Sequence, residues 1–154
     1  MNRERWIIAH AAATWYMTGV IWMVQWVHYP LFANVGDDAF VAYQRAHTSG
    51  MTPVVLPAML VELIAAALLA SGRVPVRGRT LARIGFALVL ATWGSTFLVQ
   101  VPLHERLLNG FDADTHAGLV ASNWFRTVLW TTRGLLAGVL LADELRNPRE
   151  SRES

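Results

Sequence analysis

The sequence predicts an all-α fold, a four-helix transmembrane bundle with up-down-up-down topology. Of its 154 residues, 54% are hydrophobic and only 16% are charged, whereas a soluble domain carries about a quarter charged residues. Four apolar stretches are each long enough to cross a bilayer as a helix. The segments between them contain the prolines, glycines and charged residues that are typical of helix ends and loops.

A single membrane domain is predicted over residues 1–142, because the chain is short. Its spans cover about residues 6–29, 52–70, 83–103 and 118–141. The first stretch is too long and too rich in tryptophan for a signal peptide, and no small-residue cleavage site closes it. Residues 37–48 are amphipathic and are expected to lie at the membrane interface. Residues 143–154 are charged and are expected to form a disordered cytoplasmic tail.

The arginines predict the orientation. All thirteen basic residues are arginine, and four of them lie between the second and third spans, at Arg73, Arg77, Arg79 and Arg83. Both chain ends are also richer in arginine than the two remaining loops. The positive-inside rule therefore predicts a multi-pass protein of the inner (plasma) membrane with both termini in the cytoplasm. A net charge of +2 does not indicate nucleic acid, so the expected partner is the lipid bilayer.

Polar residues form a stripe on the fourth span, where Asn123, Arg126, Trp130 and Arg133 recur at helical spacing. An unpaired arginine inside a bilayer costs about 2.5–3.5 kcal/mol on insertion scales. Glu62 is the only acid inside an apolar span, so we expect it to form a buried ion pair with Arg133. Arg126 lies nearer the outer end of its helix, where it could instead extend toward the membrane surface.

Three histidines are expected to converge at the outer end of an up-down bundle, because His28 ends the first span, His47 precedes the second and His104 ends the third. Imidazole is a common ligand, so these residues are candidates to hold a transition metal or a haem. Ordinary hydrogen-bonding roles are the alternative. The candidates for a surrounding pocket are Gln25, Tyr43, Gln100, Asn123, Arg126 and Trp130.

Residues 25–32 (QWVHYPLF) and 100–104 (QVPLH) form a weak internal repeat, which two similar helical hairpins would explain. Together with residues 123–130 (NWFRTVLW), these motifs resemble a family of small four-helix bacterial integral membrane proteins of unknown function. More distantly, they resemble the anthrone-oxygenase-like family. The resemblance extends from about Trp15 to Leu141. It implies a shared fold, and its distant part implies oxidation of an aromatic small molecule.

Three functions are left as hypotheses. The first is a metal- or haem-dependent redox protein that acts on a small apolar or aromatic molecule. The second is a non-catalytic binding or carrier protein for a lipid-like or quinone-like ligand, and the third is a structural subunit of a membrane complex or a homo-oligomer. The chain has no cysteine, no nucleotide-binding loop and no serine-nucleophile motif, which argues against thiol chemistry, ATP-driven transport and hydrolysis.

Overall fold

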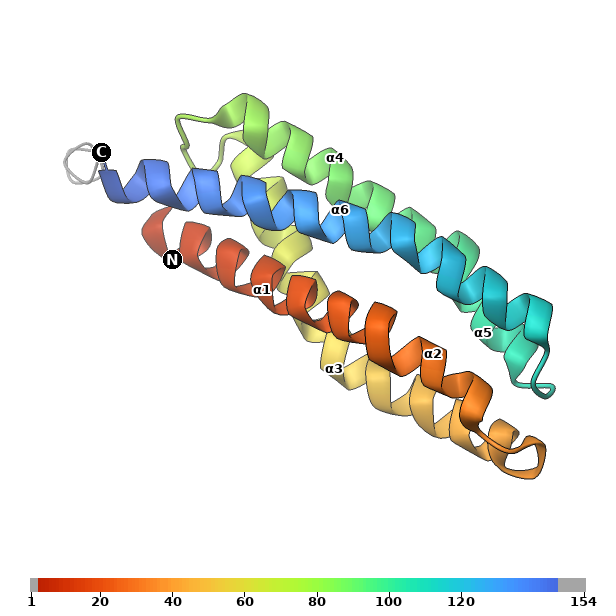
Figure 1. Ribbon diagram of the computed structural model, residues 1–154. Helices are drawn as coiled ribbons and strands as arrows, with labels where there is room; N and C mark the ends of the chain where they lie inside the picture. Colours follow the sequence, from red (N-terminus) through yellow and green to blue (C-terminus); the bar gives the residue numbers. More distant parts are fainter. Residues whose placement is uncertain (1–2, 147–154) are drawn as a thin grey trace.

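The computed structural model, which describes residues 3–146, forms four long helical rods and contains no strand in that range (Figure 1). The first rod consists of α1 (Arg3–Met23), a π-helical turn (Val24–His28), α2 (Tyr29–Leu31) and a 3-10 turn (Phe32–Asn34). The second rod is α3 (Asp37–Ser71). The third consists of α4 (Arg79–Ser95), a π-helical turn (Thr96–Gln100) and α5 (Val101–Leu107), and the fourth is α6 (Ala113–Arg146). The predicted all-α four-helix bundle is confirmed.

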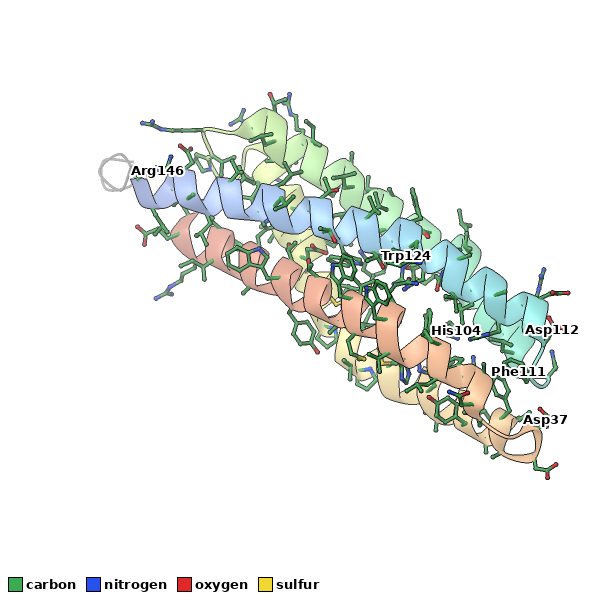
Figure 2. All side chains as sticks on the ribbon, in the orientation of Figure 1. Asp37, His104, Phe111, Asp112, Trp124 and Arg146 are labelled. Carbon is green, nitrogen blue, oxygen red and sulfur yellow. The ribbon has the colours of Figure 1, made fainter. Side chains whose placement is uncertain are left out.

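Successive rods run in opposite directions and close into a bundle. The first rod packs against α3 and α6, and α4 packs against the same two helices from the other side. Both described ends of the chain lie together, at what we call the termini end, and Arg3 of α1 forms an ion pair with Glu144 of α6 at 2.5 Å (Figure 1). We call the opposite end, which carries Asp37 and Asp112, the far end (Figure 2).

Three of the four rods have the composition of membrane helices. These three are long and apolar enough to cross a bilayer: residues 3–34, 37–71 and 79–107. The fourth, α6, has 34 residues, but its composition alone does not assign a span because Arg126 and Arg133 interrupt its apolar stretch. Large apolar side chains cover the outer surface of the bundle, and Leu98 (80% exposed) and Leu135 (70%) are extreme examples. Such a surface is compatible with contact with lipid.

The interior contains three apolar clusters along the bundle axis. At the termini end, Ile7 and Leu140 pack with Leu69. In the middle, Met17 and Met59 pack around Trp130, which is fully buried. At the far end the cluster is aromatic, and its members are Tyr29, Phe32 and Phe40 with Val24, Leu107 and Leu119.

Close contact between α1 and α6 depends on glycine. Gly134 and Gly138 lie four residues apart on α6, a spacing that allows two helix backbones to approach. The main-chain oxygen of Gly134 accepts a 3.0 Å hydrogen bond from Nε1 of Trp15. A Cβ atom at Gly134 would lie 3.2 Å from Oγ1 of Thr18. The interface between α1 and α6, which we call the seam, therefore has no room for a side chain at this position.

The structure differs from the predictions for residues 37–48. They form the first turns of α3 and are not a separate segment, because α3 continues through Pro53 and Pro57 to Ser71. Tertiary packing explains the difference. Phe40 and Gln44 are fully buried against the other rods, which fixes these turns in the bundle.

The ends of the last two rods are also longer than predicted. Residues 104–107, which lie beyond the predicted third span (83–103), are the last turn of α5. Residues 143–146, which we expected in a disordered tail, are the last turn of α6, where Glu144 forms an ion pair with Arg3. The rest of the predicted tail, residues 147–154, lies outside the described residues.

Candidate functional site

A cavity of about 330 Å³ lies among the rods toward the far end. Most of its lining is apolar and comes from methionine and aliphatic side chains, including Met17, Ile21, Met51 and Val55. The exposed lining residues include Thr52 of α3, and Val101 and Glu105 of α5. The cavity therefore opens between α3 and α5, on the side of the bundle.

Besides the exposed Glu105, five larger polar side chains reach the same cavity from all four rods: Tyr29, His47, Gln100, His104 and Arg126. Figure 2 shows His104 toward the end of the bundle that carries Asp37 and Asp112. A mainly apolar cavity with a few convergent polar groups is the usual form of a small-molecule site. This cavity is the candidate functional site.

Two π-helical turns bring polar residues into this region, and each is followed by a proline. Val24–His28 precedes Pro30, and Thr96–Gln100 precedes Pro102. Proline has no backbone N–H and cannot continue the regular helical ladder. Wide π-helical turns are frequent at functional sites because they re-aim side chains. The predicted internal repeat thus corresponds to the same local structure in two rods.

Tyr29 is the centre of the polar network. Its side-chain oxygen lies 2.9 Å from Nε2 of His104 and 3.3 Å from Oε1 of Gln100. The guanidinium of Arg126 also lies beside this oxygen. The main-chain carbonyl of Tyr29 contacts Nε2 of His116 at 2.8 Å, which helps to fix the tyrosine backbone.

The hydrogen-bond partners of His104 assign its tautomer. Nε2 of Gln44 lies 2.9 Å from Nδ1 of His104 and donates to the main-chain oxygen of the same residue at 3.1 Å. This second bond fixes the amide orientation, so Nδ1 of His104 is an acceptor. His104 therefore carries its proton on Nε2 and donates it to the oxygen of Tyr29, whose own proton is directed at Gln100.

His28 and His47 form a second pair at the cavity. Nε2 of His28 lies 2.7 Å from Nδ1 of His47, so one ring donates and the other accepts. The rings of His47 and His104 are 5.0 Å apart, and Phe32 packs edge-on against His28 and His47. The three histidines thus converge, as expected from the ends of their helices.

These contacts do not form a metal site. Within residues 3–146, no group of three His, Asp or Glu side chains is arranged to hold a metal ion. Both nitrogens of His104 have hydrogen-bond partners, and His28 and His47 are bonded to each other. The expectation that His28, His47 and His104 ligate a metal is therefore not supported. Four of their six ring nitrogens serve the alternative role, ordinary hydrogen bonding.

Two predicted pocket residues, Asn123 and Gln25, orient Arg126 through a chain of hydrogen bonds. Its Nη1 donates to Oδ1 of Asn123 at 3.1 Å, and Nδ2 of Asn123 donates to Oε1 of Gln25 at 2.9 Å. Arg126 is only 8% exposed, so it faces the interior and does not extend toward the membrane surface. Gln25 and Asn123 orient Arg126 but do not line the cavity.

Two other predicted pocket residues lie elsewhere. Trp130 is buried in the middle cluster, where its ring contacts the Arg133 guanidinium at 5.2 Å. Tyr43 packs beside Phe32, behind the histidine pair. Helical spacing correctly placed both residues on the inner face, but spacing does not give the depth or the side on which a cavity opens.

The predicted buried ion pair is present. Nη2 of Arg133 pairs with Oε1 of Glu62, and both side chains are 1% exposed. The same carboxylate oxygen accepts a 2.7 Å hydrogen bond from Oγ1 of Thr14. This cluster joins α1, α3 and α6 in the middle of the bundle, deeper than the cavity.

Tyr29 and Gln44 were missed as site residues. Tyr29 follows His28 directly and lies one residue before a proline, and this position at a helix irregularity was the available signal. Gln44 lies three residues before His47, on the same helical face. Which ring nitrogen Gln44 contacts depends on tertiary structure and could not be read from the sequence.

Comparison with protein-family models, with curated proteins and with solved structures found no match for this chain. The class of the protein therefore rests on its structure. It is a helical bundle with three candidate membrane spans and a mainly apolar cavity that a few polar side chains reach.

Proposed function

We propose that this protein binds a small, mainly apolar molecule with a polar head group, which enters the cavity from the bilayer. The observation that carries the proposal is the cavity itself. Its aliphatic lining suits an apolar tail, and its polar groups, among them Tyr29, Gln100 and Arg126, suit a hydrogen-bonding head. We expect a lipophilic molecule to enter through the opening between α3 and α5, on the side of the bundle.

This proposal develops the hypothesis of a binding or carrier protein. The metal- or haem-dependent redox hypothesis finds no support in the side-chain arrangement, because no group of three His, Asp or Glu among residues 3–146 is arranged to hold a metal ion. A purely structural subunit needs no cavity of this kind. The resemblance to anthrone-oxygenase-like proteins is compatible with an apolar ligand, but the proposal does not depend on it.

A second candidate function is proton transfer to or from the bound molecule. Two of the cavity-lining groups, His47 and Tyr29, are each hydrogen-bonded to another titratable ring, His28 and His104 respectively. Such pairs can pass a proton to a bound group, which is the basis of general acid–base catalysis. An enzyme of this type would isomerise or ionise its substrate. Its substrate or product should co-purify with the protein, so the ligand test described below also examines this function.

We further propose that all four rods cross the inner membrane, with both termini in the cytoplasm and the far end outside. The arginine distribution supports this orientation. Because the chain has no cysteine, single cysteines can report it. An impermeant thiol reagent should label Asn109→Cys in intact cells, and Thr80→Cys only after permeabilisation. Both positions are exposed in the structure. The reverse pattern would overturn the orientation.

Co-purified ligand is the direct test of the binding function. The protein is extracted in mild detergent, and organic-solvent extracts are analysed by mass spectrometry. We expect a lipophilic compound in wild type that is lost in Val55→Phe, which fills the cavity. The matched control is Val54→Phe, since Val54 is exposed on the neighbouring face and does not line the cavity. Equal recovery from both variants would contradict the proposed site.

A further inference from the structure

Two arginines of α6 are buried, and only one has a carboxylate partner. Arg133 pairs with Glu62. Arg126, which is 8% exposed, contacts the amide oxygen of Asn123 and the oxygen of Tyr29, and its Nε has no hydrogen-bond partner. Among the described residues, no Asp or Glu forms an ion pair with Arg126. Glu105 lines the same cavity but is exposed at its opening.

A buried guanidinium without a counter-ion is unfavourable. Desolvation costs several kcal/mol per ion in a protein interior, and neutral oxygens recover only part of that cost. Buried charges in proteins are therefore normally paired. The side chain of Arg126 lines the cavity, so a molecule inside the cavity can supply the missing negative charge.

We infer that the ligand of this cavity is an amphiphilic anion, with its head group on the guanidinium of Arg126, beside Tyr29, and its aliphatic tail along the apolar lining. This inference rests on the proposed binding function and specifies its ligand class. The head is an oxygen anion, since guanidinium groups form their strongest hydrogen bonds with carboxylates and phosphates. The tail packs against Met17, Ile21, Met51 and Val55, which suit a flexible alkyl chain.

Such an anion could be a free carboxylic acid or an anionic lipid of the bilayer. The test titrates decanoate, methyl decanoate and decyltrimethylammonium into wild-type protein in phosphatidylcholine nanodiscs at mildly alkaline pH, and monitors thermal stability. We expect decanoate to raise the melting temperature and the cation to have no effect. Repeating the titration with phosphatidylglycerol in the nanodiscs distinguishes the sources, because a lipid ligand would compete with decanoate.

Two arginine variants distinguish a specific contact with the Arg126 guanidinium from a general electrostatic attraction of decanoate to the far end. Arg126→Met should weaken decanoate binding about ten- to hundred-fold, the loss expected for a hydrogen bond to a charged group, and should leave methyl decanoate unchanged. Arg106→Met is the matched control, because Arg106 is exposed at the same end of the bundle. Should Arg126→Met fail to fold, Tyr29→Phe, compared with Tyr43→Phe, should weaken decanoate binding several-fold.

The outcomes distinguish the two proposals. Equal binding of decanoate and methyl decanoate would overturn the anionic ligand and keep an apolar binding site. No binding of any probe, together with no co-purified compound, would overturn the binding function itself. Equal losses in Arg126→Met and Arg106→Met would show that the attraction is a property of the far end as a whole, and would overturn the assignment to Arg126.

Discussion

Arg133 and Arg126 lie on the same helix, seven residues and about 10 Å apart, yet their surroundings differ. Arg133 is enclosed by Glu62, Thr14 and Trp130 in the packed middle of the bundle. Arg126 lies beside a hollow and has only neutral partners. Arg133 has a carboxylate counter-ion within the chain, although some of its nitrogens lack hydrogen-bond partners, whereas the charge of Arg126 is uncompensated.

Because of this difference, we expect Arg133 to contribute to the stability of the fold and Arg126 to the binding of a ligand. A charge that the fold itself neutralises holds the rods together, and its loss should affect unfolding. A charge that the fold leaves unpaired is unfavourable in the empty protein and is available to a ligand. The same contrast holds for packing, because the seam at Gly134 has no spare volume and the far end contains a cavity.

The largest effect is expected in the middle of the bundle. Glu62→Gln and Arg133→Met should each lower the free energy of unfolding by about 3–5 kcal/mol, since each strands a buried charge. The double variant should lose less than the sum of the two. Denaturant unfolding in detergent micelles measures all three, and strictly additive losses would show that the two side chains do not interact.

A smaller loss is expected from overpacking the seam between α1 and α6. Gly134→Leu should lower the free energy of unfolding by about 1–3 kcal/mol, because the new side chain meets Thr18 and Trp15. Gly85→Ala is the control, since a Cβ at this buried glycine of α4 has no atom within 4 Å. A Gly134→Leu protein as stable as wild type in thermal melts would contradict close packing in the middle.

Arg126→Met should change stability less than Arg133→Met. Its removal relieves an uncompensated buried charge but leaves Oδ1 of Asn123 without this donor, and an unsatisfied buried acceptor costs about 1–3 kcal/mol. These contributions oppose each other, so we expect a net change of about 1 kcal/mol or less in unfolding experiments without ligand. A loss equal to that of Arg133→Met would remove the contrast between the two arginines.

The smallest effect is expected at the surface of the far end, where Asp112 caps α6. Its Oδ1 accepts a 2.7 Å hydrogen bond from the amide of Thr115. Hydrogen bonds from the Thr115 side chain and amide hold the pKa of Asp112 below its usual value of 3.8. The capping stabilisation should be complete above that usual pKa and should disappear as the pH falls through the lower, folded-state pKa.

The melting temperatures of wild type and Asp112→Asn, followed from neutral to acidic pH, test this prediction. The difference between them should shrink on acidification. Asp114→Asn is the control, because Asp114 is exposed in the same first turn. A difference that grows as the pH falls would contradict the sign of the pKa shift.

Helical periodicity and charge were sufficient to predict the bundle and its buried ion pair. Apolar length indicated the four rods, and the single intramembrane acid identified the partner of Arg133, because only Glu62 was available. The ends of three spans brought His28, His47 and His104 together. The features that could not be predicted depend on side-chain direction. The Gln44 amide that fixes the His104 tautomer comes from another rod, and the position of Trp130 below the cavity depends on where the helices separate.

The central claim is that a lipophilic anion occupies the cavity beside Arg126, and photolabelling locates such a molecule directly. A decanoate analogue with a diazirine in its alkyl chain is irradiated with the protein in nanodiscs, and labelled residues are mapped by mass spectrometry. We predict labelling at Ile21, Met51 and Val55 that an excess of decanoate prevents. Labelling confined to outward-facing residues such as Leu98, Val128 and Leu135, unaffected by decanoate, would contradict the claim.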